Sequence, residues 1–232
     1  MDIKDLEKLI IDEFEKIITQ IISDYPDLNI SAKARAGAEV SNFLEEKFVE
    51  YSRRNKFFKD SEKSPEGATK NPWDAKTVFC FKNLQEIIWV DFKALKTSGK
   101  DSNPDIGTPN KIINFIKDGN FFLLYLYVFY EETKNGLKFV RINGSFTKSY
   151  FLKDIHPSFR RNPKNQLQVN MSEPPEYRSR GEFIKLLMKK IGESHARQIK
   201  ISEKALKTIS EEEKNLLNKN KESEAKILSS LK

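Results

Sequence analysis

The unbroken apolar run Phe121–Tyr130 is the sequence feature that most limits what this chain can fold into. A membrane-spanning helix needs about 20 such residues, so the run is too short to cross a bilayer. Continuous apolar character is typical of a strand in the middle of a sheet whose two faces are both covered. The turn pair Asn135-Gly136 follows, and it predicts a hairpin that returns along that sheet. The run therefore predicts a layered fold built around one central strand.

Helical and extended patterns occupy separate parts of the chain. Apolar residues at helical spacing predict helices over residues 3–23, 32–53, 109–117, 182–192 and 202–231. Clusters of β-branched and aromatic residues predict strands over 77–81, 86–95, 137–142 and 145–152, the first two joined as a hairpin by a turn at 82–85. The polar segments 56–71, 97–107 and 156–180 are expected to be loops. These patterns predict a mixed α/β (α+β) fold with a central mixed β-sheet flanked by helices. We expect one domain over 1–232, in which 193–232 form a C-terminal helical extension.

Charge points to an anionic partner without identifying it. The chain has 41 Lys and Arg residues against 34 Asp and Glu residues, which gives a formal net charge of +7. An excess of positive charge favours nucleic acid or a membrane surface as a partner. A soluble protein with a merely lysine-rich surface would show the same excess. Charge alone leaves both interpretations open.

Few residues are available for disulfides or for nitrogen and sulfur metal ligands. The single cysteine excludes an internal disulfide, and two histidines make a histidine-based metal centre improbable. Any bound metal is therefore expected to have oxygen ligands, which favours magnesium or manganese. Acidic residues interrupt the apolar pattern near the N-terminus, so no secretory signal is predicted and a bacterial cytoplasm is the expected location.

One group of charged residues follows the apolar strand at 86–95. Alternate side chains of a strand share a face, so Asp91 and Lys93 are expected to point the same way, with Val90 and Phe92 directed into the core. If the turn is centred between residues 83 and 84, Asp74 lies opposite Lys93. The three polar side chains would then meet in one small patch.

That patch has a chemical rationale and a simpler alternative. Two carboxylates can hold a hard divalent cation, which neutralises a phosphodiester and acidifies a bound water. A lysine beside them can orient that water and add positive charge where negative charge develops. An acid two residues before a lysine is nevertheless common by chance in a chain so rich in both. A surface hairpin with an ordinary salt bridge is the alternative.

These residues resemble the PD-(D/E)xK nucleases, and within them the type II restriction endonucleases. Asp74 matches the first acid of that motif and Asp91-Phe92-Lys93 its second half, although Trp73 separates Pro72 from the acid. Ala36-Gly37-Ala38-Glu39 resembles the glutamate-bearing start of the family's first helix. The stretch from Asp91 to Pro109-Asn110-Lys111-Ile112-Ile113 is similar to the blunt-cutting branch typified by HincII and EcoRV. The resemblance covers about residues 32 to 130.

The resemblance implies a restriction-endonuclease-like fold and a specific reaction. Asp74 and Asp91 would bind Mg²⁺, for which Mn²⁺ could substitute, Lys93 would orient the attacking water, and Glu39 would be an auxiliary acid. Water would attack a phosphodiester of double-stranded DNA in line, leaving 5′-phosphate and 3′-hydroxyl ends. A homodimer would cut both strands of a palindromic site. A cognate methyltransferase is expected to be encoded nearby, without being a bound subunit.

Further residues are candidates for DNA contact because they combine positive charge with amide groups on polar segments. They are Lys96, Lys100, Asn103, Asn110, Arg160, Arg161, Asn162, Lys164, Asn165, Gln166 and Gln168. Solvated loops would have the same composition. Three other functions also stay open: a repair or junction nuclease of the same fold, a non-catalytic DNA-binding protein, and an interaction protein that uses its C-terminal helix.

Overall fold

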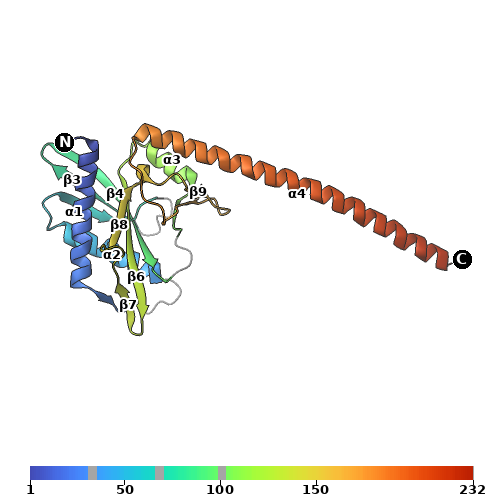
Figure 1. Ribbon diagram of the computed structural model, residues 1–232, viewed down its shortest axis with the longest axis horizontal. Coiled ribbons are helices and arrows are strands. Elements are labelled where there is room, and N and C mark those ends of the chain that lie inside the picture. The colour runs from blue at the N-terminus through green and yellow to red at the C-terminus, as the bar shows by residue number, and fades with distance from the viewer. Residues whose placement is uncertain (31–35, 66–70, 99–102, 232) are drawn as a thin grey trace. The chain divides into compact units, whose positions relative to one another are not determined.

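The structure of the protein is a computed structural model that describes residues 1–30, 36–65, 71–98 and 103–231 (Figure 1). The chain forms two compact units, Met1–Leu186 and Leu187–Lys232. The first unit contains the sheets and most of the helices. The second consists of the greater part of one long helix.

The helices are α1 (Ile3–Asp24), α2 (Ala36–Ser52), α3 (Pro109–Lys117) and α4 (Arg180–Ser230), with a 3₁₀ turn at Leu152–Asp154. Thr108 caps α3, and its side chain accepts a hydrogen bond from the Lys111 backbone N–H. The predicted start of the second helix at 32–35 lies outside the described residues. None of the described helices is long and apolar enough to cross a membrane.

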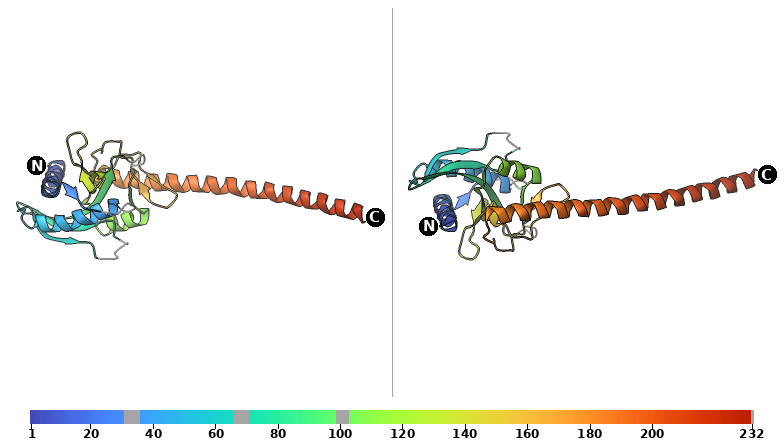
Figure 2. Two further views of the ribbon diagram at one scale, coloured as in Figure 1. Left: turned by 90° about the horizontal axis from the view of Figure 1, so that it is seen from below. Right: turned by 90° about the horizontal axis from the view of Figure 1, so that it is seen from above.

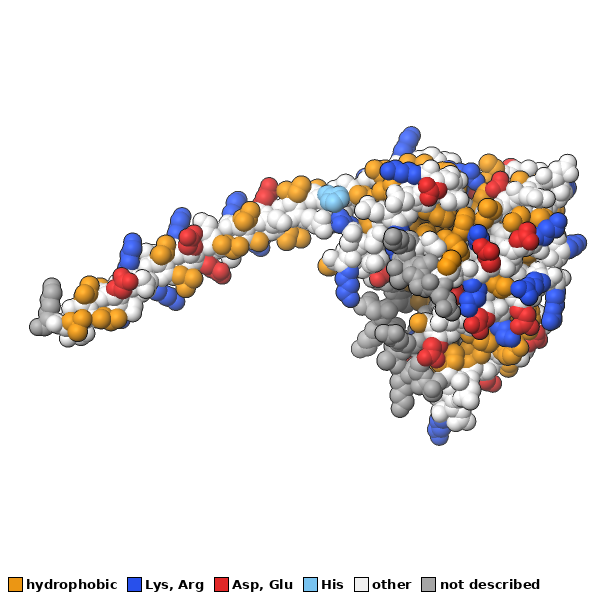
Figure 3. All heavy atoms as spheres, turned by 180° about the vertical axis from the view of Figure 1, so that it is seen from behind, with side chains coloured by type: hydrophobic (Ala, Val, Ile, Leu, Met, Phe, Trp, Pro, Cys, Tyr) orange, Lys and Arg blue, Asp and Glu red, His pale blue; other side chains and the backbone are white. Residues whose placement is uncertain are grey.

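The two predicted C-terminal helices are one continuous helix, so the predicted break was wrong. Gly192 lies inside α4, where a glycine costs only about 1 kcal/mol relative to alanine and does not have to end a helix. Side chains of the helix from residue 195 onward are exposed. They include a series of large apolar residues, seen among the charged ones in Figure 3: Ile199, Ile201, Leu206, Ile209, Leu216, Leu217, Ile227 and Leu228.

The main sheet is mixed, as predicted. Its strands are β1 (Asp27–Leu28), β2 (Phe58–Lys63), β3 (Ala75–Phe81), β4 (Leu84–Lys96), β6 (Leu123–Thr133), β7 (Gly136–Phe139) and β8 (Thr147–Phe151). The order is β1-β7-β6-β4-β3-β2, and β8 also pairs with β6. β4 and β6 are parallel, joined through α3, and the other pairs are antiparallel. A second, smaller antiparallel sheet has the order β5 (Asp105–Gly107), β10 (Leu167–Gln168), β9 (Arg160–Arg161).

The apolar run became the central strand β6, with residues 123–130 all buried. Its even-numbered side chains join those of β4 in a core covered by α1 and α2, which lie over one face of the sheet (Figure 2). Its odd-numbered side chains, such as Tyr125 and Tyr127, point to the opposite face and are equally buried. Burial on both faces explains why β6 shows no alternation of apolar and polar residues.

Four short strands occupy segments expected to be loops. β2 pairs only with β3, at the edge of the sheet, and most of its side chains are exposed, so it lacks the apolar alternation that predicts strands. β5, β9 and β10 have only two or three residues each, too few to show a period. The strand predicted over 137–142 ends at Phe139, and only an isolated bridge joins Ile142 to Ser145.

The β3–β4 hairpin has a shorter turn than predicted, and this shifts its register. Phe81 pairs with Leu84, so the turn is Lys82-Asn83, with Lys82 in the left-handed region at φ 53°. Continued past the Ala75–Val90 pair, this register places Asp74 opposite Asp91 and not opposite Lys93. Because the shift is two residues, every side chain keeps its predicted face.

Candidate active site

Asp74, Asp91 and Lys93 lie together where β3 begins beside β4. The Asp74 backbone N–H donates to the Val90 carbonyl over 2.8 Å, which extends the hairpin ladder by one residue. The Phe92 N–H donates to Asp74 Oδ2, also over 2.8 Å, and holds that carboxylate against β4. Lys93 Nζ lies 2.7 Å from Asp91 Oδ1. The predicted convergence is therefore present, with the two acids adjacent.

Burial and neighbouring charges give this group unusual electrostatics. Asp91 is only 5% exposed, and burial raises its pKa well above the usual range, opposed by Lys93 and reinforced by Asp74. Burial acts to lower the pKa of Lys93, but the charges of Asp91 and Asp74 outweigh it and the pKa is raised. The lysine therefore stays protonated beside Asp91, whose burial makes its ionisation costly.

The acids open into a pocket of about 230 Å³. It is lined by Asn71, Pro72, Trp73, Asp74, Asp91, Lys93, Asp105, Ile106, Gly107, Lys111 and Gln166. The Trp73 ring packs against Trp89, with centroids 4.8 Å apart, so both tryptophans of the chain lie at this site. A larger hollow of about 510 Å³ lies elsewhere on the same sheet face. Its lining includes no carboxylate, so the pocket that holds the acids is the candidate active site.

The donor atoms fit a hard divalent cation. In the part of the chain that is described, no group of three or more His, Cys, Asp and Glu residues is arranged for a metal. Asp74 and Asp91 are the adjacent carboxylates that would hold a cation at this pocket, and backbone or water oxygens would complete its shell. A buried carboxylate with a second one beside it is a place where added positive charge is favourable.

The acid that α2 contributes near the pair is Glu45, whereas Glu39 was predicted. Glu39 is exposed and makes no hydrogen bond or ion pair with another described residue. Glu45 is half-buried, and burial together with the charge of Asp74 raises its pKa to about 7. The positive charge of Lys93 acts in the opposite direction and lowers the pKa of Glu45. The two positions are six residues apart on one helix, so they face different sides.

Several predicted DNA contacts gather in the hairpin β9–β10. Its loop is closed by Arg161 Nε donating to Asn165 Oδ1 over 2.5 Å and by the Asn162 N–H donating to the Gln166 carbonyl over 2.8 Å. Arg160, Lys164 and Asn165 are exposed on it. Gln166 reaches the acid pocket. The hairpin therefore brings charged and amide side chains to the edge of the acid pocket.

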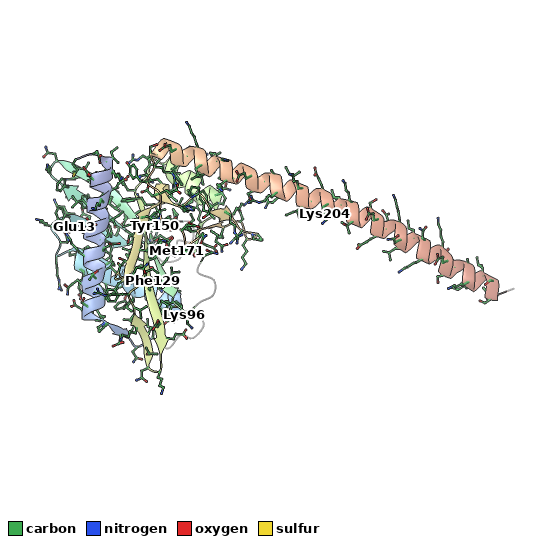
Figure 4. All side chains as sticks on the ribbon, in the orientation of Figure 1. Glu13, Lys96, Phe129, Tyr150, Met171 and Lys204 are labelled. Carbon is green, nitrogen blue, oxygen red and sulfur yellow. The ribbon has the colours of Figure 1, made fainter. Side chains whose placement is uncertain are left out.

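The remaining candidates are dispersed. Asn103, Arg160 and Gln168 line a separate small polar pocket of about 220 Å³. Asn110 is exposed in the first turn of α3. Lys96 forms an ion pair of 2.7 Å with Glu132 and lines the larger hollow with Phe129 and Met171 (Figure 4). Lys100 lies outside the described residues.

Three polar residues near the acids were not predicted as site residues. Asp105 lies in β5 and its charge reaches Lys93. Lys111 comes from the first turn of α3, and Glu45 from the middle of α2. Lys111 lies within the stretch that resembles the blunt-cutting branch, which was the one available signal. Nothing local in the sequence distinguishes Glu45 or Asp105 from the many other acids of the chain.

Comparisons with known proteins identify the family of this chain. The sequence model of one protein family, described as SwaI-like, SwaI restriction endonuclease, matches residues 2–209. No curated protein matches the chain. Among solved structures, the NlaIV restriction endonuclease is similar with a TM-score of 0.48 and 15% sequence identity, over 82% of this chain and 80% of that chain. The family match extends over most of the sequence, and so the chain belongs to the SwaI-like family of type II restriction endonucleases, which are site-specific deoxyribonucleases.

Proposed function

We propose that this enzyme cuts both strands of duplex DNA at a palindromic site, with Mg²⁺ as cofactor and Asp74, Asp91 and Lys93 as its catalytic residues. The observation that carries the proposal is the buried Asp91 carboxyl beside the partly buried Asp74, with a protonated lysine 2.7 Å from Asp91. Asp74 and Asp91 would hold the metal, and Mn²⁺ would substitute for it. We assign the auxiliary acid to Glu45 in place of Glu39.

Each side chain then has a distinct task. The bound cation would neutralise the phosphodiester and acidify a water. Lys93 orients that water in line with the scissile bond and adds positive charge as the phosphorus gains negative charge. Asp91 fixes the lysine by their ion pair, and the Phe92 N–H fixes Asp74. Attack by water breaks the bond to the 3′ oxygen, which leaves a 5′-phosphate and a 3′-hydroxyl. Blunt ends are expected from the resembling branch.

DNA binding is assigned to the hairpin β9–β10 and the residues near it. The exposed Arg160 and Lys164 suit phosphates, and the amides of Asn165 and Gln168 suit base edges. A homodimer would present the same contacts to both half-sites. A protective methyltransferase encoded nearby and a bacterial cytoplasm fit the same role.

Digestion of a long mixed-sequence DNA with and without magnesium tests the proposal. Wild-type protein should give discrete fragments that need the metal, and Asp91→Ala should give none. Glu86→Ala, on the same strand, is the matched control and should cut like the wild type. Intact DNA with both magnesium and manganese, on a substrate rich in palindromes, would contradict the proposal. Random fragments would instead indicate a repair or junction nuclease of this fold.

A further inference from the structure

The small sheet joins the hairpin β9–β10 to β5. β10 pairs with β5 at Leu167–Gly107 and Gln168–Asp105. A side-chain bond adds to this pairing, because Asn162 Nδ2 donates to Asp105 Oδ1 over 3.0 Å. The hairpin and β5 therefore form one hydrogen-bonded unit, and β5 contributes three residues to the lining of the acid pocket.

One buried side chain connects β5 to the catalytic sheet. The Tyr125 hydroxyl donates to the Ile106 carbonyl over 3.0 Å. Tyr125 is completely buried and Ile106 is 2% exposed, so water cannot replace this bond. In the parallel β4–β6 pairing, Tyr125 is the register partner of Asp91. The same residue thus touches the small sheet at one end and neighbours a catalytic acid at the other.

The other tyrosines of this sheet face have a different partner. Tyr150 donates its hydroxyl to that of Tyr127 over 3.0 Å, and both are buried. Figure 4 marks Tyr150 on β8, near Met171. Loss of this bond would remove a buried tyrosine hydrogen bond from the same cluster without detaching β5. Tyr150 therefore provides a matched control for Tyr125.

We propose that Tyr125 is a positioning residue that holds the β5–β10–β9 sheet in register with Asp91, so that DNA bound by the hairpin presents its scissile phosphate to the acid pair. This rests on the proposed DNA contacts of the hairpin. Cleavage depends steeply on such alignment, because a misplacement of about 1 Å can cost on the order of 100-fold in rate. Affinity depends on the hairpin's own side chains and is much less sensitive to that register.

The test compares Tyr125→Phe with Tyr150→Phe in the full-length protein. The probe is a duplex carrying a cut site mapped by sequencing the ends of wild-type fragments. Single-turnover rate with magnesium, the Kd without divalent metal, the active fraction and the melting temperature are measured for each. We expect Tyr125→Phe to cut roughly 10- to 100-fold more slowly while its Kd stays within about twofold. Tyr150→Phe should keep a near wild-type rate. A merely structural loss would lower the active fraction and the melting temperature, and not the rate of the active molecules.

The proposal is overturned if the two variants cut at the same rate, or if Tyr125→Phe loses affinity in proportion to rate. Should Tyr125→Phe fail to fold, Asn162→Ala removes the exposed bond to Asp105 and should slow the single-turnover rate at saturating enzyme. Because Asn162 is itself a candidate DNA contact, this rate and not its Kd is the readout for that variant. An unchanged rate would count against the proposal. If the hairpin did not contact DNA at all, Arg160→Ala would leave the Kd unchanged. That result distinguishes a failure of the proposed DNA contacts from a failure of the positioning role of Tyr125.

Discussion

At the scale of single residues, two carboxyl groups at the site are held where ionisation is costly. Burial comes first among the causes for both Asp91 and Glu45, and the charge of Asp74 adds to each. In the metal-free protein these acids oppose folding when they are charged. Bound magnesium would offset the cost of ionising these carboxyl groups. The stability of the metal-free protein and the affinity for metal should therefore both change with pH over the range in which the groups ionise.

Glu45→Gln is expected to stabilise the metal-free protein at pH 8 and not at pH 5. The folded-state pKa of Glu45, about 7, lies above its ordinary value of 4.5, so the folded state holds the proton more tightly between those values. Stability is therefore lost as pH rises through that window, and glutamine avoids the loss. Allowing for the water that reaches this half-buried group, we expect roughly 1 kcal/mol, or about 2–4 °C in melting temperature.

Glu39→Gln, on the exposed side of the same helix, is the matched control and should change neither melting curve. Thermal unfolding at the two pH values in the presence of a chelator gives the comparison. The same variants test the auxiliary acid, because only Glu45→Gln should slow cleavage. If Glu39→Gln slowed cleavage as much as Glu45→Gln, Glu45 would not be the auxiliary acid.

The sequence was sufficient to find some of these residues and not others. Alternation along β4 predicted that Asp91 and Lys93 share a face, because a strand has a period of two whatever its surroundings. The residue opposite Asp91 depends on the two-residue turn that begins at Lys82. Lysine does not favour the left-handed backbone of that position, so the sequence did not predict this turn. Glu45 was missed because its environment is created by tertiary packing.

At the scale of elements, the hairpin β9–β10 is the part of the molecule that best suits contact with DNA. It concentrates exposed basic and amide side chains on two-residue strands joined by a short loop. Such strands cannot be predicted from periodicity, although the composition of the segment predicted contact with DNA. The long elements β4, β6 and α1 were predictable, because each spans several periods of its pattern.

Arg160→Ala is expected to weaken DNA binding and to make its salt dependence shallower. Loss of one phosphate contact removes about one released counterion, so the slope of log affinity against log salt should fall by about 1. Fluorescence anisotropy with a labelled duplex over a range of salt concentrations measures this slope. Lys138→Ala, an exposed basic residue on β7, is the control and should leave the slope unchanged. Equal slopes for wild type and Arg160→Ala would exclude a phosphate contact at this position.

At the scale of the whole molecule, cutting both strands of a palindrome requires two active sites, and each chain has one acid pair. The exposed apolar series on α4 offers a surface that a second copy could cover. We expect the full-length protein to have the mass of two chains in light scattering. Leu216→Glu combined with Leu217→Glu should shift it to one chain and replace double-strand cuts by nicks.

Lys207→Glu, a charge change on the same helix, is the control and should stay dimeric. A double variant that still has the mass of two chains would place the dimer contact elsewhere. The exposed apolar series lies within the expected helical extension at 193–232. The role of that extension as a dimer contact stays a proposal. The net charge of +7 would favour the approach of such a dimer to DNA without selecting a sequence.

Both tryptophans of the chain lie beside the acid pair, with Trp73 lining the pocket and Trp89 packed against it. The protein therefore has an intrinsic fluorescent probe at the one place where cofactor and substrate are expected to meet. Ultraviolet emission of unlabelled enzyme should report metal arrival, DNA engagement and product departure as separate phases in a stopped-flow instrument. The arrangement of the two indole rings would thus allow the reaction cycle to be timed without a label.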